Sequence, residues 1–360
     1  MTKRAGNLLE SIADPDNLRL AFWKARKGKS YSTEVAAYRK NVEQNLFQLR
    51  SEVLSGTVNV GKYRYFKIYD PKERQICASA FNEQVLHHAL MNCCHDTFER
   101  WQIWDSYASR KGKGTYAAIE KAKRFTRHYT WFLKLDVRKF FESIAHDVLK
   151  HQLRCLFKEA AVLSVFDSII DSYEAHPKRG VPIGNLTSQY FANHYLCSLD
   201  HFIKEHLRIK AYVRYMDDMI LWENDKEVLQ DAYIRIKTFV QTQLHCELKP
   251  PQLNYTSRGL PFLGYKLLPY SIKLTQRSKQ RFIKKMRYLD EAYHTGNWSE
   301  TTCQRHALPL LAFVNHADAK GLRSNIIGNE PRESRRQLEQ QRAELPHHEP
   351  QQQHARESQQ

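Results

Sequence analysis

The chain has 360 residues, of which 42% are hydrophobic and 12% aromatic, so it can bury a large core as one elaborate domain or a few subdomains. It has no run of apolar residues long enough to span a membrane, and residues 1–10 lack the apolar stretch of a signal peptide, so we expect a soluble cytoplasmic protein without a membrane partner. Lys and Arg exceed Asp and Glu by 17, a positive charge that is most often used on nucleic acid. The seven cysteines include no C-x-x-C pair, which argues against a disulfide framework and a zinc ribbon.

The first part of the chain is predicted to be helical up to a basic β-hairpin. Apolar residues recur mostly at helical spacing over residues 17–54, and a Lys27-Gly28-Lys29 turn interrupts them, so we expect two helices. The aromatic and β-branched run at residues 63–69 is followed, after a short charged turn, by residues 74–77. This pattern predicts the two strands of the hairpin.

A long helix and a basic loop are predicted next. Residues 80–104 carry apolar side chains at the helical period, and residues 109–115 form a basic stretch with two glycines before another helix. This stretch does not fit the Walker A spacing. It is either a contact for phosphate through main-chain and lysine groups or an ordinary loop that precedes a helix.

The middle of the chain has the strongest strand signals. Residues 131–137 are apolar enough for a central strand, and this strand ends in a carboxylate. Residues 148–157 and 162–175 have the helical pattern, and a loop at residues 180–184 leads into a helix predicted over residues 188–207.

The remaining elements alternate strands and helices. Residues 211–222 predict two short apolar strands hinged at two adjacent carboxylates. We expect a helix over residues 226–244, strand regions over 248–255 and 260–266, and a helical pattern with a basic face over 276–313.

Past Asn329 the composition changes to Gln, Glu, Arg, His and Pro. Such a segment cannot bury enough apolar surface to offset the entropy of ordering, so we expect a disordered polar tail.

Three carboxylates are the candidates for chemistry. Asp217 and Asp218 are adjacent in an apolar hairpin, where their charges are costly unless a cation neutralises them. Paired Mg²⁺ ions can stabilise the attacking 3′-oxygen and the leaving pyrophosphate of a phosphoryl displacement, and they need ligands from more than one strand. Asp136, at the end of its own strand, supplies the missing carboxylate. In the alternative interpretation the pair is only a polar hairpin turn, and Asp136 is a helix N-cap.

The motifs around these carboxylates resemble those of a known family. Tyr215-Met216-Asp217-Asp218 resembles the catalytic box of reverse transcriptases. Asp136 with Phe140 and Phe141 is similar to their first palm motif, and Phe262-Leu263-Gly264-Tyr265 to their primer-grip turn. Order and spacing agree over about residues 60–270.

A loop narrows the resemblance further. Most bacterial reverse transcriptases carry Gln-Gly-x-x-x-Ser-Pro before the palm helix, whereas this chain has Ile183-Gly184-Asn185-Leu186-Thr187-Ser188-Gln189. That form resembles the reverse transcriptases of diversity-generating retroelements. Residues 316–323 are also similar to that family, as a weaker signal.

The resemblance implies an α+β right-hand polymerase fold. N-terminal helices and fingers would occupy residues 1–130, a palm of antiparallel sheet and helices 131–270, a helical thumb 271–326, and a disordered polar tail 327–360.

The implied function is that of a bacterial or phage-encoded enzyme in the cytoplasm. It copies a template-repeat RNA into cDNA with frequent errors opposite adenine, and the product diversifies a target gene. Template RNA, cDNA or primer, dNTPs and a basic oligomeric accessory variability protein are the implied partners.

The resemblance also implies residue roles. The implied catalytic residues are Asp136, Asp217 and Asp218, and the implied ligands of two Mg²⁺ ions, for which Mn²⁺ can substitute, are these three with Val137. Contacts with the incoming nucleotide are implied for Lys67, Arg74, Phe141, Ile183, Gln189 and Lys249. Contacts with primer and template are implied for Tyr215, Met216, Phe262, Leu263, Gly264, Arg277 and Lys284.

Several of these assignments have simpler alternatives. Arg74 presents a planar fork suited to phosphate oxygens, yet it and Lys67 can equally be solvated charges. Phe141 stands where the family crowds the ribose 2′-OH, but it or Phe140 can belong to the core. Lys249 either neutralises the departing pyrophosphate or is solvated.

Two other functions remain open from the sequence. One is a generic bacterial reverse transcriptase of the group II intron, retron or phage-defence type, against which the Ser188-Gln189 pair argues. The other is a non-catalytic RNA-binding scaffold on a degenerate polymerase fold. That scaffold predicts loss of palm carboxylates, yet all three are present.

Overall fold

The computed structural model describes residues 4–29, 31–69 and 73–327, and the predicted tail from residue 328 onward lies outside them. The chain forms two compact units. The first comprises Met1–Leu263 and Leu267–Tyr270, and the second comprises Gly264–Lys266 and Ser271–Gln360. Among the described residues, no helix combines the length and the apolar character needed to cross a membrane.

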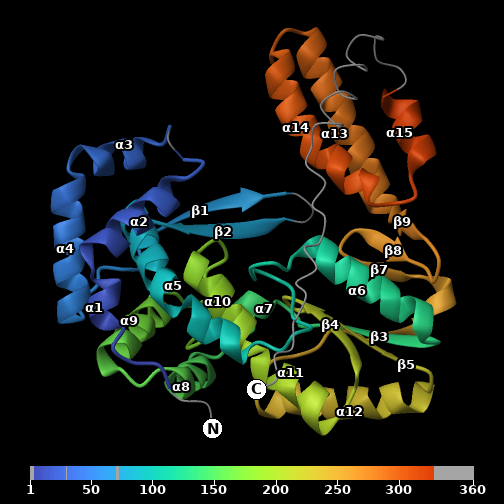
Figure 1. Ribbon diagram of the computed structural model, residues 1–360, viewed down its shortest axis with the longest axis horizontal. Coiled ribbons are helices and arrows are strands. Elements are labelled where there is room, and N and C mark those ends of the chain that lie inside the picture. The colour runs from blue at the N-terminus through green and yellow to red at the C-terminus, as the bar shows by residue number, and fades with distance from the viewer. Residues whose placement is uncertain (1–3, 30, 70–72, 328–360) are drawn as a thin grey trace, which may run out of the picture. The chain divides into compact units, whose positions relative to one another are not determined.

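The first unit begins with short helices that pack on a long one (Figure 1). These elements are α1 (Leu9–Ile12), α2 (Pro15–Arg26), α3 (Thr33–Lys40), α4 (Val42–Ser55) and α5 (Phe81–Trp101). Asp14 caps α2 by accepting from the main-chain N–H groups of Asp16 and Asn17. The prediction of two helices over residues 17–54 is wrong, because the second divides at Asn41. Its φ of −124° and ψ of 40° are not helical.

The predicted basic hairpin is confirmed. Strand β1 (Tyr63–Ile68) pairs antiparallel with β2 (Arg74–Ser79), with Tyr63 opposite Ser79 and Ile68 opposite Arg74. Helix α6 (Thr115–His128) follows the basic loop, as expected.

A four-stranded antiparallel sheet positions the carboxylates. Its order is β4 (Ala211–Tyr215), β5 (Asp218–Glu223), β3 (Trp131–Asp136) and β6 (Gln252–Tyr255), so β3 is internal as predicted. Helix α12 (Lys226–Thr242) packs against β5 and β3 (Figure 1). Strand β7 (Leu260–Phe262) is the last strand of the first unit.

Helices between β3 and β4 build the core of the first unit. They are α7 (Phe140–Ser143), α8 (His146–Leu156), α9 (Ala160–Asp171), α10 (Leu186–Tyr195), α11 (Cys197–His201) and a π-helix (Phe202–His206). The single helix predicted over residues 188–207 is thus three segments. The break falls at Leu196, whose ψ of −2° departs from helical geometry.

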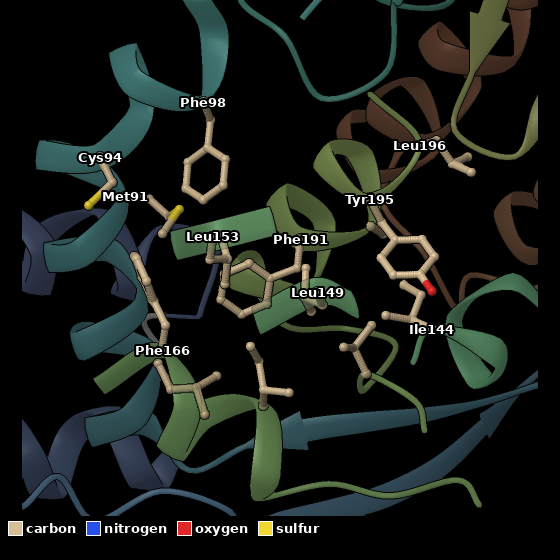
Figure 2. Close-up of a cluster of buried hydrophobic side chains, with 14 of the residues drawn as sticks. Met91, Cys94, Phe98, Ile144, Leu149, Leu153, Phe166, Phe191, Tyr195 and Leu196 are labelled. Carbon is tan, nitrogen blue, oxygen red and sulfur yellow. The ribbon is translucent and has the colours of Figure 1, made fainter. Parts of the chain in front are cut away.

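Aromatic side chains from α5, α9 and α10 meet in one cluster. Figure 2 shows Phe98 of α5, Phe166 of α9 and Phe191 of α10 among aliphatic side chains from α8. The Tyr195 hydroxyl donates to the Leu244 carbonyl at 2.6 Å and accepts from the Ala145 N–H at 3.2 Å. This packing fixes α10, whose first turn belongs to the loop motif singled out in the sequence.

The second unit is mainly helical. It contains β8 (Tyr265–Leu267, whose last residue belongs to the first unit), β9 (Ile272–Leu274), α13 (Gln276–His294), α14 (Glu300–Asn315) and α15 (Lys320–Ile327). The helical stretch predicted over residues 276–313 is therefore two helices, separated near Gly296, whose φ of +70° suits glycine. Likewise, the strand predicted over residues 260–266 divides into β7 and β8, because Leu263 (φ +47°) and Gly264 (φ +89°) form a turn.

Candidate active site

The three candidate carboxylates meet at one end of the four-stranded sheet. Asp136, the last residue of β3, lies directly opposite Asp218, the first residue of β5. Asp217 belongs to the two-residue loop that joins β4 to β5. Like charges directly opposite each other in a sheet repel, so this arrangement needs compensating cations.

Two lysines supply that compensation. Lys134 Nζ donates to Asp218 Oδ2 at 2.9 Å and to the Pro261 carbonyl at 2.8 Å. Lys249 Nζ donates to Asp136 Oδ1 at 2.6 Å, and its main-chain N–H donates to the Asp136 carbonyl at 2.8 Å. Lys249 thus lies against Asp136, while its predicted contact with the nucleotide stays a prediction, and Lys134 is an addition to the set.

Asp217 and Asp218 are harder to ionise than ordinary aspartates. Burial raises the pKa of Asp218 to about 6, although the Lys134 ammonium opposes the rise. Burial and then the neighbouring Asp136 raise the pKa of Asp217. Asp218 Oδ1 is buried and has no hydrogen-bond partner among the described residues. A buried carboxylate oxygen without a donor is a free ligand position for a cation.

The donor chemistry at this end of the sheet fits Mg²⁺ or Mn²⁺. Both ions prefer carboxylate and carbonyl oxygens, and Asp136, Asp217 and Asp218 offer only such atoms. Val137, the other residue predicted as a ligand, is buried and pairs with Leu248. However, within residues 4–29, 31–69 and 73–327 no three acidic, His or Cys side chains are arranged as a ready metal-binding group. Lys134 and Lys249 hold Asp218 Oδ2 and Asp136 Oδ1, so a cation that binds those two oxygens exchanges with an ammonium group.

The two phenylalanines after Asp136 have different environments. Phe140 is 3% exposed and belongs to the core, whereas Phe141 is only partly buried against that core. Their ring centroids are 5.8 Å apart. Phe141 is thus the one with a face available to a ligand.

The Ile183 loop is docked on the hairpin. The Ile183 carbonyl accepts from the Cys77 N–H at 2.8 Å, and Asn185 Oδ1 accepts from the Ser79 N–H at 3.3 Å. Gly184 has a φ of +126°, and a Cβ there would lie 2.9 Å from Ile76 Cγ2. The close approach explains why glycine stands at this position.

The basic loop touches both the Ile183–Gln189 motif and the catalytic box. Ser109 Oγ donates to Gln189 Oε1 at 3.1 Å, and Thr115 Oγ1 donates to the Tyr215 hydroxyl at 3.2 Å. Lys113 Nζ lies 3.6 Å from the ring centroid of Trp104. These contacts join the loop to the site.

The other predicted residues lie on the hairpin and in the turn and helix that follow the sheet. Lys67 and Arg74 are exposed on the hairpin, where Lys67 Nζ is 2.7 Å from Glu73 Oε1. Phe262 is 1% exposed, and its ring centroid lies 5.9 Å from Lys134 Nζ. Gly264, Arg277 and Lys284 belong to the second unit. Arg277 and Lys284 are exposed on α13. The main-chain carbonyl of Gly264 accepts a hydrogen bond from Ser278 Oγ at 2.7 Å.

Sequence reasoning missed Lys134. It precedes Asp136 by two residues, and alternate residues of a strand share a face, so a lysine inside an apolar strand was the available signal. Lys134 and Asp218 each keep 20% of their side-chain surface exposed, and a charge so buried is seldom without a partner.

Comparisons with known proteins agree with these features. Residues 72–267, more than half of the chain, match the family described as reverse transcriptase (RNA-dependent DNA polymerase). A putative COX1/OXI3 intron 1 protein of Saccharomyces cerevisiae is 20% identical over 217 residues, which cover 56% of this chain and 26% of that protein. An uncharacterized 91 kDa protein in the cob intron of Schizosaccharomyces pombe is 27% identical over 105 residues, which cover 28% and 13%. The chain thus spans about a quarter or less of these relatives.

The fold has a solved counterpart in apo telomerase from Candida tropicalis. The TM-score is 0.51 at 12% identity, and the match covers 78% of this chain and 61% of that chain. At this identity the likeness concerns the fold alone, and it confirms the predicted mixed α+β polymerase architecture. Together with the family match over residues 72–267, the carboxylate-bearing sheet shows that the chain belongs to the reverse transcriptase family.

Proposed function

We propose that this protein is an RNA-directed DNA polymerase whose catalytic residues are Asp136, Asp217 and Asp218. The observation that carries the proposal is their geometry. Asp136 and Asp218 face each other across β3 and β5, Asp217 adjoins them, and Asp218 Oδ1 is buried without a donor. A sheet end that gathers three acids in a strongly basic chain is suited to phosphoryl transfer on nucleic acid.

The proposed reaction joins the primer 3′-oxygen to the α-phosphorus of a dNTP. The bond from that phosphorus to its bridging oxygen breaks, pyrophosphate leaves, and the hydroxyl proton passes to solvent. Two Mg²⁺ ions, or Mn²⁺, would be held by the three aspartates with Val137 and would stabilise charge on the attacking and leaving oxygens. Lys249, 2.6 Å from Asp136, would neutralise the leaving pyrophosphate.

Selection of the nucleotide is proposed to use residues around the carboxylates. The partly exposed Phe141 would crowd a ribose 2′-OH and so favour dNTPs. Lys67 and Arg74, exposed on the hairpin, would hold the triphosphate, with Arg74 offering the better fork for phosphate oxygens.

Primer and template contacts are proposed on both units. Tyr215, Met216 and the Phe262-Leu263-Gly264 turn would hold the primer end. Arg277 and Lys284 on α13 would contact phosphates without regard to sequence, which suits a polymerase that must move along its template.

We further propose that the enzyme is of the diversity-generating kind. It would copy a template-repeat RNA with errors opposite adenine, assisted by a basic oligomeric variability protein, in the cytoplasm of a bacterium carrying the element or its phage. The Ile183–Gln189 motif supports this subtype, because the docked loop holds an apolar side chain where most bacterial relatives have Gln. Resemblance to the yeast intron protein fits a generic reverse transcriptase equally well.

Primer extension on an RNA template tests the activity. Asp217→Asn should abolish extension while RNA binding and melting temperature persist, because the basic surface is unchanged. Asp231→Asn on α12 is a matched control, since its side chain is 68% exposed. Extension by Asp217→Asn at the wild-type rate would refute the site. Sequencing the cDNA then tests the subtype, and equal error rates at all four template bases with the accessory protein present would leave a generic enzyme.

A further inference from the structure

A buried arginine immediately precedes the catalytic box in the sequence. Arg214 is the fourth residue of β4 and precedes Tyr215, and its side chain is 0% exposed. Its partner Asp200, on α11, is also 0% exposed. Burial alone would lower the pKa of the Arg214 guanidinium, but the Asp200 carboxylate outweighs this and raises it. The roles proposed above do not use either residue.

The Arg214 guanidinium donates hydrogen bonds to several acceptors. Arg214 Nε lies 2.7 Å from Asp200 Oδ1, and Nη2 lies 2.6 Å from Asp200 Oδ2. Nη1 donates to Asn193 Oδ1 at 2.8 Å, and Nη2 also lies 3.3 Å from Gln102 Oε1. A planar fork with fixed donor directions can serve all these acceptors at once, which a lysine cannot.

The remaining donor reaches the catalytic turn itself. Arg214 Nη1 donates to the main-chain carbonyl of Met216 at 3.2 Å. Met216 has a φ of +53°, a region that L-residues occupy only at a cost in free energy. The next residue is Asp217. A charged donor on the Met216 carbonyl therefore helps to hold the strained peptide that orients the catalytic pair.

The arginine is itself held on several sides. Its main-chain N–H donates to the Asp105 carbonyl at 3.0 Å, and its carbonyl accepts from the Tyr107 N–H at 3.0 Å. Asn193 Nδ2 donates to the Ala108 carbonyl at 3.0 Å, and the Tyr212 hydroxyl donates to Asp200 Oδ1 at 2.7 Å. Helices α10 and α11 and the segment before the basic loop thus fix the guanidinium against the turn.

We propose that Arg214 is a positioning residue for the polymerase reaction, acting through the Met216 carbonyl on Asp217 and Asp218. The inference rests on the proposed catalytic role of those two aspartates. A purely structural role explains the geometry less well, because an apolar pair of similar volume generally stabilises a core as well as a buried ion pair does. Such a pair cannot donate to a carbonyl.

A compensated variant separates the two roles. Arg214→Met alone leaves Asp200 charged and buried, so it should unfold or melt at a much lower temperature. Adding Asp200→Leu and Tyr212→Phe removes the whole charged group together with the hydroxyl that would lose its acceptor. The triple variant should regain the wild-type melting temperature and duplex affinity. Its kcat should still fall on the order of 10- to 100-fold, and the Mg²⁺ concentration for half-maximal rate should rise.

Two companion variants make the result decisive. Tyr212→Phe alone is the matched control and should keep kcat within about twofold, since Arg214 keeps its bond to Met216. Arg214→Lys keeps the charge but not the fork, so it should lose kcat while binding duplex normally. If the triple variant does not fold, Arg214→Lys decides the question.

A folded triple variant, or Arg214→Lys, with wild-type kcat and Mg²⁺ dependence would overturn the inference. Asp217→Asn is measured alongside. If it is inactive while the triple variant is fully active, only the positioning role fails. If Asp217→Asn itself extends primers normally, the proposed catalytic site fails, and the inference fails with it.

Discussion

Lys134 opposes the rise that burial causes in the pKa of Asp218, and its removal should change how the enzyme responds to pH and Mg²⁺. The Lys134 ammonium lies 2.9 Å from Asp218 Oδ2, and the pKa of Asp218 is about 6 with this partner present. A charged hydrogen bond contributes about 1.5–3 kcal/mol, which corresponds to about 1–2 pKa units. Lys134→Met should therefore raise the pKa of Asp218 further, by the same margin.

The sign of the effect depends on pH. Where Asp218 holds a proton, a cation must displace it, so the half-saturating Mg²⁺ concentration rises about tenfold per pH unit below the pKa. Wild type should show this rise below pH 6. In Lys134→Met the rise should begin one to two units higher, which weakens Mg²⁺ use at pH 7 by about 2- to 10-fold. At pH 9 the variant should use Mg²⁺ at least as well, because a competing ammonium is gone.

Single-nucleotide primer extension, titrated with Mg²⁺ at pH 6, 7, 8 and 9 under saturating dNTP, measures this shift. Lys237→Met, at an exposed position on α12, controls for the loss of one positive charge. Parallel curves for wild type and Lys134→Met, with no change in the pH at which Mg²⁺ use weakens, would refute the role of Lys134.

Other substitutions separate neighbouring roles. Asp218→Asn should abolish extension yet stabilise the metal-free protein at pH 7. Because folding raises the pKa of Asp218 from 3.8 to about 6, the folded state binds more protons than the unfolded chain between these two pH values. The wild-type free energy of unfolding therefore falls by roughly 2–3 kcal/mol as the pH rises from 3.8 to about 6. Thermal unfolding in EDTA at pH 4 and pH 7 measures this, and an equal change with pH in the variant would contradict it. Phe141→Ala should raise ribonucleotide incorporation, whereas Phe140→Ala, at a position 3% exposed, should cost about 3–5 kcal/mol of stability and leave sugar selection unchanged. Competition between labelled rNTP and dNTP, with unfolding curves, distinguishes them, and an unchanged ratio in Phe141→Ala would place that ring in the core. Ile183→Gln should lower misincorporation opposite template adenine and spare the other bases, and Gln189→Pro should alter the same quantity by reshaping the first turn of α10 and removing the bond from Ser109. Error rates per template base in sequenced cDNA decide both, and rates equal to wild type would exclude this loop from base selection.

Local pattern identified most elements but not the breaks inside the longer helices. The strands were predictable because apolar and β-branched runs end at turn residues, and the pairing of β3 with β5 brings Asp136 opposite Asp218. The breaks at Asn41 and Leu196 were not, because helical apolar spacing continues across both. They depend on how the segments pack, and the break at Leu196 precedes the short helix that carries Asp200.

The candidate site, too, was predictable from the sequence only in part. Acids in an apolar hairpin are conspicuous in a sequence, because their cost points to a cation. Their partners are not, because Lys134 reaches Asp218 through the register of β3 with β5, and Lys249 reaches Asp136 from a distant part of the chain. Arg214 is close to Met216 in the sequence, but its guanidinium is held by the distant residues Asp200 and Asn193. A basic chain offers many lysines and arginines, and only the fold selects which of them are paired.

These partners have a consequence for cation binding. Lys134 and Lys249 each hold one oxygen of a candidate ligand, so two of the three carboxylates have an ammonium partner before any metal arrives. A divalent ion that binds those two oxygens exchanges with ammonium groups, which reduces its net gain in binding free energy. Mg²⁺ commonly binds through one or two carboxylates together with substrate phosphates. We infer that phosphate oxygens of the incoming nucleotide supply much of the affinity, so that the metal site forms together with the substrate complex.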